Sequence, residues 1–339
     1  MRRQRAREWE GGVPTDPDTF RTLIAESCEP VVVRGLCNHW PSTRAAGQSR
    51  ESLIDYLLQF DSGAAAQAFI GQPGIAGRYF YSDNLSGFNF ERKDLSMPQA
   101  VTQIAASAAA PGSPTIYVGS VPADDHFPGF AEENSLPVLA ASVRPRVWIG
   151  NASAVACHYD TYDNLACVVA GRRRFTLYPP DAIGSLYVGP IDHTMAGQPV
   201  SLAAGCEPGD PRYPRFEAAR ERALMADLGP GDALYLPKLW WHQVEATEPF
   251  NLLVNFWWDA FRAGPDAPYS AMMLAMIAIA ERSAKERAAC SAFFDHYVFR
   301  PNGHPLAHLP EDKRGILGPL AQGNYGRLRA AIMQMLRGG

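Results

Sequence analysis

The sequence predicts a mainly β protein with added helices, in which a double-stranded β-helix, or jelly roll, forms the core. Three observations favour this class. Short apolar or aromatic segments crowd the middle of the 339-residue chain, turn signals separate them, and helical spacing dominates only near the C-terminus. Many short strands between turns are typical of a sandwich or barrel rather than of β-α-β units. We therefore expect three regions, at residues 1–113, 114–262 and 263–339.

The first region, residues 1–113, mixes helices with strands. A β-branched run predicts a short strand at residues 30–34, which the glycine that follows it ends. Helical spacing of apolar residues predicts three helices, at residues 19–26, 52–60 and 97–108. We expect these N-terminal α/β elements to pack on the core.

The second region, residues 114–262, holds the predicted core strands. Turn signals separate them, including Gly171 and the sequence Gly-Pro-Gly-Asp at residues 229–232. The predicted strands are the apolar or aromatic runs at residues 116–121, 146–149, 165–169, 174–178, 233–236 and 251–258. Their shortness and number make a jelly roll the expected arrangement of this region.

The third region, residues 263–339, is predicted to be helical. Helical composition and spacing extend over residues 271–289 and 325–336. The apolar face of the first helix is rich in methionine and includes Met272 and Met276. Such a face either packs on the barrel or forms an interface with a partner. We expect a homodimer that forms through these C-terminal helices.

Charge, hydropathy and cysteine usage exclude several classes of protein. The net charge of −4 gives no global basic field, so no nucleic-acid partner is expected. The longest apolar run, residues 271–280, is too short to span a bilayer, and no apolar stretch follows the N-terminal arginines. The six cysteines are scattered without a Cys-x-x-Cys pair, which argues against a zinc ribbon or a disulfide scaffold. We expect a cytoplasmic protein without a membrane partner.

Three side chains far apart in the sequence predict a metal site. His158 and Asp160 lie two positions apart, and residues with this spacing on an extended strand share one face. His242 comes 84 positions after His158, behind a turn and an apolar strand. Two histidines and one carboxylate on one face are typical of Fe(II) oxygenases, because they leave coordination positions open. A His-x-Asp triplet alone often arises by chance, so the prediction depends on all three residues.

A run of three arginines predicts a binding site for an anion. Residues 172–174 begin a predicted strand, on which neighbouring side chains point to opposite faces. If Arg172 and Arg174 face solvent, Arg173 faces inward. A buried guanidinium needs an anionic partner, and a dicarboxylate cosubstrate would supply one through two parallel hydrogen bonds.

Together these residues resemble the JmjC/cupin-like (cupin_8) family of Fe(II)- and 2-oxoglutarate-dependent oxygenases. Within that family they are similar to the asparaginyl hydroxylase that inhibits hypoxia-inducible factor. The resemblance covers most of the chain. It rests on four segments: the N-terminal strand with its Trp-Pro element at residues 30–41, the metal hairpin at residues 158–180, and the closing strands at residues 229–244 and 254–257.

The resemblance assigns a role to eight residues. It implies that His158, Asp160 and His242 are the catalytic iron ligands. It places Arg173 where the hydroxylase uses a lysine to bind the distal carboxylate of 2-oxoglutarate. The remaining cosubstrate residues that it implies are Tyr117 beside that carboxylate, Asn164 and Asn255 near the cosubstrate and metal, and Trp257 in the pocket wall.

Two departures from the family pattern concern the cosubstrate. Val155 stands where the hydroxylase has a threonine hydroxyl, so one hydrogen bond to 2-oxoglutarate is missing. The arginine at position 173 also changes the geometry of the anion contact, since a guanidinium and an ammonium are not interchangeable.

The resemblance implies an oxygenase that consumes O₂ and 2-oxoglutarate, hydroxylates a substrate and releases succinate and CO₂. The substrate stays open between a protein or peptide side chain and a small metabolite. Histone demethylation is less favoured, since we expect no reader domain or basic tail. A different class of function is a non-oxygenase metal-binding cupin that acts as an isomerase or a binding protein. The long polar segment at residues 191–213 is a candidate lid or substrate wall. For Asp192, His193, Asp210 and Arg212 within it, a solvated position is favoured over a substrate contact for each. A second candidate wall includes Asp83, Asn84 and Asn89.

Overall fold

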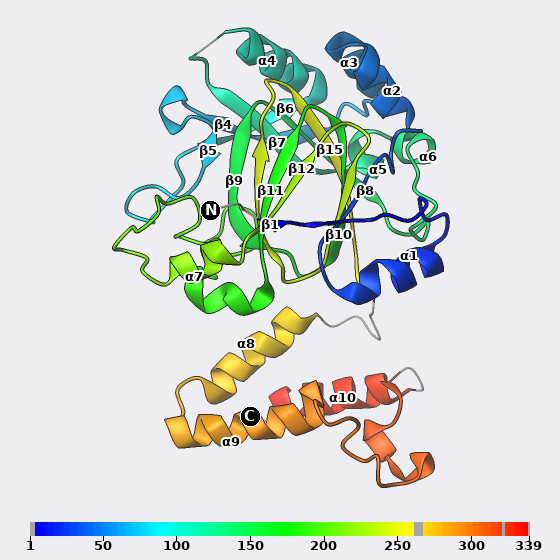
Figure 1. The fold of residues 1–339 in the computed structure, drawn as a ribbon, viewed down its shortest axis with the longest axis vertical. Helices are drawn as coiled ribbons and strands as arrows, with labels where there is room; N and C mark the ends of the chain where they lie inside the picture. Colours follow the sequence, from blue (N-terminus) through cyan, green and yellow to red (C-terminus); the bar gives the residue numbers. More distant parts are fainter. Residues whose placement is uncertain (1–3, 111, 261–266, 321–322, 338–339) are drawn as a thin grey trace. The chain divides into compact units, whose positions relative to one another are not determined.

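A computed structural model describes residues 4–110, 112–260, 267–320 and 323–337 (Figure 1). The chain divides into two compact units, Met1–Ala260 and Phe261–Gly339. The boundary expected between residues 262 and 263 lies outside the described residues. Within the described part, no helix combines the length and the apolar character that a membrane crossing requires. All six cysteines are free.

The first unit is built from two facing β-sheets (Figure 1). The smaller sheet contains, in spatial order, β1 (Gln4–Arg5), β12 (Leu224–Leu228), β11 (Arg173–Tyr178), β14 (Trp241–Ala246), β9 (Ser153–Tyr159) and β5 (Arg78–Tyr79). The larger sheet contains β2 (Arg7–Glu8), β3 (Val31–Val33), β13 (Ala233–Leu236), β10 (Asp163–Ala170), β15 (Asn251–Trp258), β8 (Pro145–Gly150), β7 (Thr115–Pro122), β4 (Ala65–Gly71) and β6 (Glu91–Ser96).

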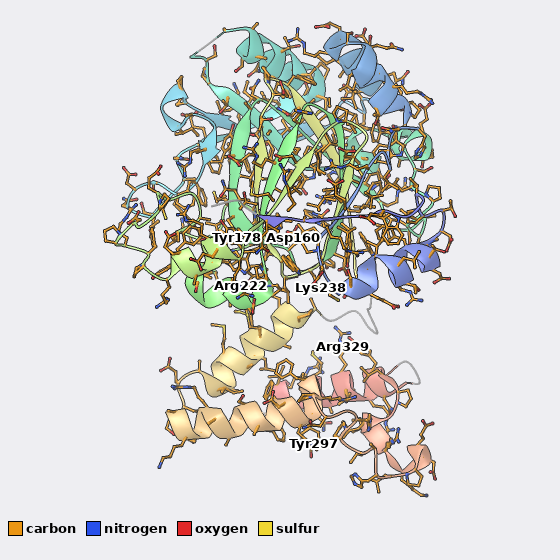
Figure 2. All side chains as sticks on the ribbon, in the orientation of Figure 1. Asp160, Tyr178, Arg222, Lys238, Tyr297 and Arg329 are labelled. Atoms are coloured by element: carbon orange, nitrogen blue, oxygen red, sulfur yellow. The ribbon has the colours of Figure 1, made fainter. Side chains whose placement is uncertain are left out.

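The chain crosses repeatedly from one sheet to the other, as the predicted jelly roll requires. β8, β10, β13 and β15 belong to the larger sheet, while β9, β11, β12 and β14 belong to the smaller one. Apolar side chains of both sheets, such as Val168 of β10 and Phe175 of β11, belong to one hydrophobic cluster. Figure 2 draws the side chains on the ribbon. β10 lies between β13 and β15, and all eight of its residues are buried, because it is covered on both faces.

The N-terminal elements belong to the β unit and are not a separate layer added to it. Residues 1–113 supply β1 to β6, of which β3 pairs with β13 and β4 pairs with β7. The main hydrophobic core joins Phe20, Trp40 and Leu53 from this region to the larger sheet. The helices of the unit are α1 (Pro17–Leu23), α2 (Pro41–Gln48), α3 (Arg50–Leu58), α4 (Met97–Ala109), α5 (Ala123–His126), α6 (Phe130–Glu133) and α7 (Phe216–Glu221), with short 3₁₀ turns η1 (Ala25–Ser27), η2 (Pro73–Ile75) and η3 (Pro180–Ser185).

A glycine fixes the turn between β10 and β11. Gly171 has a φ of +74°, a conformation that L side chains rarely adopt. A Cβ atom at this position would lie 2.2 Å from Oδ1 of the buried Asn251. β10 ends at Ala170 and β11 begins at Arg173, so this tight turn sets the position of Arg173 relative to β10.

The second unit is helical. It contains α8 (Pro268–Ile279), α9 (Ala284–Phe294), a π-helical turn η4 (Asp295–Phe299), 3₁₀ turns η5 (Glu311–Lys313) and η6 (Gly315–Leu317), and α10 (Asn324–Arg337). The single helix expected at residues 271–289 is wrong, because the structure has two helices there. Ser283 starts the second helix by accepting from the backbone N–H of Glu286, whose carboxylate in turn accepts from Ser283.

Candidate active site

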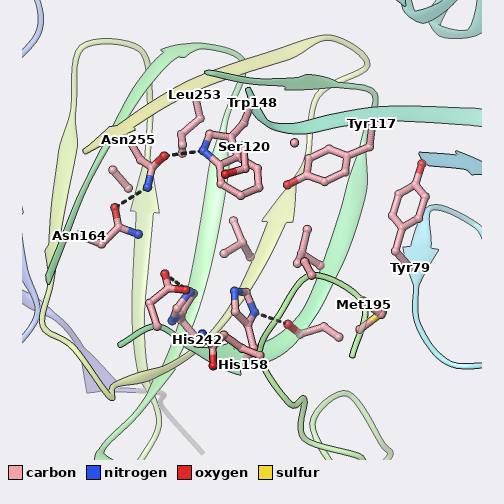
Figure 3. A pocket seen from close by; sticks show the side chains of 18 of the residues that line it. Tyr79, Tyr117, Ser120, Trp148, His158, Asn164, Met195, His242, Leu253 and Asn255 are labelled. Carbon is pink, nitrogen blue, oxygen red and sulfur yellow. Dashed lines mark hydrogen bonds and ion pairs between the residues drawn. The ribbon is translucent and has the colours of Figure 1, made fainter. Parts of the chain in front are cut away.

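The three predicted metal ligands meet between β9 and β14. His158 and His242 are directly paired in this antiparallel ladder, and their ring centroids are 4.3 Å apart. Asp160 follows the end of β9, and its Oδ2 lies 3.7 Å from Nε2 of His242. One ligand atom from each residue falls within 4.8 Å of the other two (Figure 3). This spacing lets all three bind a single ion.

Hydrogen bonds orient both imidazoles toward such an ion. Nδ1 of His158 lies 2.8 Å from the carbonyl oxygen of Ala156, and Nδ1 of His242 lies 3.0 Å from that of Trp240. A carbonyl oxygen only accepts, so each Nδ1 carries the proton and each Nε2 keeps its lone pair. Burial, with a further contribution from His158, lowers the pKa of His242 to about 4, which keeps this ring neutral. The donor set fits a divalent transition metal.

A tryptophan holds the carboxylate ligand. Nε1 of Trp257, on β15, donates to Oδ2 of Asp160 at 3.2 Å. The main chain of Asp160 is fixed as well, since its carbonyl accepts from the N–H of Leu239 at 2.8 Å. Trp257 thus ties the loop after β9 to the larger sheet.

All eight predicted site residues line one cavity between the sheets. Figure 3 labels Tyr117, His158, Asn164, His242 and Asn255 among them. The cavity measures about 170 Å³ and is mostly apolar. The predicted residues in its lining are Tyr117, His158, Asp160, Asn164, Arg173, His242, Asn255 and Trp257. Val155, the position where the family pattern has a hydroxyl, also lines it and presents an apolar side chain.

Arg173 supplies a buried cation within this cavity. Its side chain is 4% exposed, while Arg172 and Arg174 are exposed, as the alternation along β11 predicts. Within the described part of the chain, Nε and Nη2 of Arg173 have no hydrogen-bond partner. Burial lowers the pKa of Arg173 to about 10, so the group stays protonated at neutral pH. A buried guanidinium with unpaired donors fits a carboxylate ligand.

Tyr117 lies close enough to Arg173 for each to affect the ionisation of the other. Burial raises the pKa of Tyr117, so its hydroxyl stays protonated and is able to donate. The two predicted asparagines are instead bound to each other: Nδ2 of Asn255 donates to Oδ1 of Asn164 at 3.0 Å. Oδ1 of Asn255 also accepts from Nε1 of Trp148 at 2.6 Å. This chain of hydrogen bonds makes the cavity wall between β8, β15 and β10 rigid.

Sequence reasoning found a segment that lines the cavity, but it did not identify which of its residues do so. Asp192, His193, Asp210 and Arg212 do not line the cavity, whereas the residues of the same segment that do are Met195, Ala196, Gln198 and Val200. A Pro- and Gly-rich composition indicates a loop, but it does not tell which side chains turn inward.

The residues suggested for a second wall of the cavity also differ from those that line it. Asp83, Asn84 and Asn89 do not line the cavity. Asn84 accepts from Ser82 and Ser86 within its own turn, and Asn89 binds the main chain of Phe80. Phe69 of β4 and Phe90 line the cavity in their place, and neither residue has a sequence signal beyond its aromatic ring.

Comparisons with known proteins agree with this geometry. The sequence matches the family model described as a cupin-like domain over residues 17–264. A lysine-specific demethylase of Arabidopsis thaliana, JMJ31, is 35% identical over 139 residues, which cover 40% of this chain and 24% of the relative. HSPB1-associated protein 1 of Bos taurus is 30% identical over 179 residues, or 44% and 36% of the two chains. Jumonji C domain-containing protein 5 of Drosophila melanogaster is 26% identical over 252 residues, or 71% and 57%. The matched part is thus less than two thirds of the length of each relative.

Proposed function

Because the chain belongs to the cupin-like family of JmjC proteins, we propose that it is an Fe(II)- and 2-oxoglutarate-dependent oxygenase that hydroxylates its substrate. The substrate in this proposal is a protein or peptide side chain, or a small metabolite. The overall reaction converts substrate, O₂ and 2-oxoglutarate into hydroxylated substrate, succinate and CO₂. When bound, the iron and the 2-oxo acid supply the O₂ chemistry.

One observation carries the proposal: three side chains that could hold a metal ion and a buried guanidinium with unpaired donors line the same cavity. A 2-oxo acid with a second carboxylate is complementary to that pair, since one end chelates a metal and the other accepts hydrogen bonds from a cation. The cation is held in place by β11, whose neighbouring strands β12 and β14 pair with it at Arg173. The site is thus prepared for its anion before the anion binds.

The side chains of the cavity would perform three tasks. His158, Asp160 and His242 would hold the metal on one side and leave its other positions to ligands. Arg173 would bind the distal carboxylate through its planar guanidinium, and Tyr117 would donate to the same group. The lining is mostly apolar, and such surroundings lower the local dielectric constant, which would strengthen these charged interactions.

The test combines binding with turnover. Calorimetry of the Zn(II)-loaded protein measures 2-oxoglutarate binding without turnover, and we expect a single site that requires both metal and Arg173. The Fe(II)-loaded protein is then screened against peptide and metabolite libraries for succinate release, with His158→Ala as the inactive control. If His158→Ala releases as much succinate as the wild type, the proposal is wrong. Metal binding without 2-oxoglutarate binding would instead favour a non-oxygenase cupin, such as an isomerase or a binding protein.

A further inference from the structure

The helical unit contains a cavity of its own, which the site between the sheets does not use. It measures about 190 Å³, so it is similar in size to the cavity beside the metal ligands. Its lining comes from residues 300–304, which follow the π-helical turn, from residues 314–320 around η6, and from α10. We call it the basic cavity, because Arg300 and Arg314 both line it.

The positive charge of this cavity is poorly compensated. Arg300 and Arg314 are its charged residues, and no carboxylate of the described part of the chain lines it. The Arg314 side chain is 20% exposed, and its ion-pair partner, Glu311, is 83% exposed. The Nη1 and Oε1 atoms of this pair are 3.8 Å apart, which is too long for a hydrogen bond. A guanidinium that is mostly out of water gains free energy from a closer anion.

Main-chain contacts hold both guanidinium groups in place. Nε of Arg300 donates to the carbonyl oxygen of Tyr297 at 3.0 Å, and Nε of Arg314 donates to that of Leu309 at 3.2 Å. Within the part of the chain that the structure describes, no hydrogen bond uses the Nη groups of either arginine. Each planar fork therefore keeps donors for a ligand, and the entropy lost on binding that ligand is reduced.

The rest of the lining is largely apolar, from the side chains of Ile316, Leu317, Leu320 and Leu328. His304 also lines the cavity, but both of its ring nitrogens are used. Nε2 donates to the carbonyl oxygen of Leu317 at 2.8 Å, and Nδ1 accepts from the N–H of Leu306 at 3.1 Å. A ligand of this cavity thus meets two guanidinium groups at one place and hydrocarbon at the others.

The charge of the helical unit has the same sign as this cavity. Residues 261–339 contain ten lysines and arginines and six aspartates and glutamates, which gives this unit a net charge of +4. The whole chain has a net charge of −4. The field of the second unit therefore attracts small anions, although the chain as a whole is acidic.

We propose that the basic cavity binds a small organic anion, a carboxylate with an apolar body. The carboxylate would accept hydrogen bonds from Arg300 and Arg314, and the body would lie against the leucines and Ile316. An apolar cavity of about 150 Å³ is large enough for benzene, so a body of one ring fits the volume here. The proposal goes beyond the proposed oxygenase reaction and does not depend on it.

Three probes test the two parts of the ligand separately: benzoate, benzamide and acetate. Benzamide has nearly the shape of benzoate but no charge, and acetate has the carboxylate without the ring. Saturation-transfer NMR of the full chain measures the affinity of each. We expect benzoate to bind at least about ten-fold more tightly than benzamide, because hydrogen bonds between charged partners are lost. Acetate is expected to bind weakly as well, because it buries little apolar surface.

Variants assign the binding to this cavity. Arg300→Met and Arg314→Met each remove one guanidinium, and we expect each to weaken benzoate binding by about ten-fold without changing benzamide binding. Arg327→Met is the matched control, because Arg327 bonds to Asn324 and does not line the cavity. Leu328→Phe keeps the charge and fills part of the volume, and we expect it to weaken both aromatic probes. Thermal melts of each variant report whether the fold is kept.

Four outcomes would overturn the proposal. Benzoate that does not bind, or that binds no more tightly than benzamide, removes the need for an anion. A loss in Arg327→Met equal to that in Arg314→Met means that net charge and not the cavity attracts the probe. A loss of benzoate affinity in Arg173→Met moves the probe to the other cavity. Unchanged benzoate binding in both Leu328→Phe and Arg314→Met excludes the basic cavity. Failure of 2-oxoglutarate to bind contradicts only the proposed function, since these titrations contain neither metal nor 2-oxoglutarate.

Discussion

His158 and His242 stand directly opposite each other in the β9–β14 pair, although they lie 84 positions apart in the chain. The metal site is therefore a property of strand register. A slip of one residue between these strands would turn one imidazole to the other face of the sheet. The register is supported on the far side of β14, where Leu177 of β11 pairs with His242. We therefore expect substitutions that weaken the pairing in this sheet to lower the affinity for the metal even where they change the free energy of unfolding little.

The hydrogen bond from Trp257 to Asp160 predicts an effect on metal affinity. Trp257→Phe removes the Nε1–H donor and keeps an aromatic ring in the wall. We expect metal affinity to fall by about ten-fold, as is usual when the partner of a metal ligand is lost, with little change in the melting temperature. Metal affinity is measured by competition with a chromogenic chelator. Trp258→Phe is the matched control, because Trp258 packs against Phe20 and Tyr235 and does not line the cavity. Equal effects of the two variants would contradict the role of Trp257.

The unpaired guanidinium of Arg173 predicts opposite effects on binding and stability. Arg173→Met keeps much of the side-chain volume but removes the charge. We expect the dissociation constant of 2-oxoglutarate to rise by about 100-fold, since hydrogen bonds to a charged group are lost. The free energy of unfolding of the ligand-free protein should stay constant or increase, because a buried unpaired charge is removed.

The neighbouring residue on the same strand gives the control for this experiment. Arg174 is exposed and donates to Oδ1 of Asp227 at 2.8 Å. Arg174→Met should leave 2-oxoglutarate binding unchanged and cost less than about 1 kcal/mol, as is typical of a surface ion pair. A loss of stability in Arg173→Met that exceeds the loss in Arg174→Met would show that Arg173 has a structural role.

Sequence patterns predicted the parts of the site that depend on local periodicity. The alternation along residues 172–174 identified which arginine turns inward, and the His-x-Asp spacing identified two side chains on one face. The strands that carry the histidines were not predicted. β9 and β14 mix polar and apolar residues, since one face of each borders the cavity, and such segments lack the continuous apolar run of β10.

Contacts between segments that are distant in the chain could not be predicted from the sequence, because they leave no local pattern. Gln198 turns inward because Val200 pairs with His158, and Arg92 reaches the same segment through the carbonyl of Met195. Neither contact leaves a local pattern, because each joins residues that are far apart in the chain through main-chain atoms. The four polar residues singled out in the segment 191–213 do not line the cavity, and the residues that do were not identified, because chemical type does not fix the direction of a loop side chain.

The depressed pKa of His242 predicts a pH dependence for the metal-free protein. Burial lowers this pKa in the folded chain to about 4, while in the unfolded chain it is about 6.5. The unfolded chain therefore binds this proton more readily between these pH values. The stability from a neutral His242 is complete above pH of about 6.5 and is lost as the pH falls toward 4, by on the order of 3 kcal/mol.

The measurement for His242 is chemical denaturation at pH 7 and pH 5 with a chelator present. His242→Gln lacks the titrating group, so we expect its stability to fall less than that of the wild type between the two pH values. The comparison removes the contribution of all other groups, which both proteins share. An equal fall in both proteins would mean that His242 titrates normally in the folded chain.

The turn at Gly171 predicts a loss of stability with two separable parts. Gly171→Ala forces a side chain into a left-handed conformation and brings its Cβ against Asn251. Gly63 has a similar φ of +79°, but no atom lies within 4 Å of the place that a Cβ would take there. We expect Gly63→Ala to cost about 1 kcal/mol from the conformation alone, and Gly171→Ala about 3 kcal/mol, because the clash adds to it. Denaturant titration measures both. Equal losses would show that Asn251 yields to the added atom.

The helical unit predicts an assembly of two chains, which we propose to form through its apolar surface. Within the described residues, α8, α9 and α10 contain no buried side chain, and α8 has no charged residue. The exposed apolar side chains include Ile277 at 83%, Phe299 at 69% and Met335 at 68%. Exposed apolar side chains gathered in one unit favour burial against a second copy of the chain. Uncharged faces of identical chains can meet across a two-fold axis without repulsion.

Light scattering of the full chain tests this assembly. We expect the wild type to have the mass of two chains, and the double variant Ile277→Asp and Phe299→Asp to have the mass of one, because a buried unpaired carboxylate is costly. Ile183→Asp is the matched control, since Ile183 is a large apolar residue that is 49% exposed on the β unit. It should leave the dimer intact. A wild-type chain that stays monomeric at high concentration would contradict the assembly. If Ile183→Asp breaks the dimer, the interface includes the β unit.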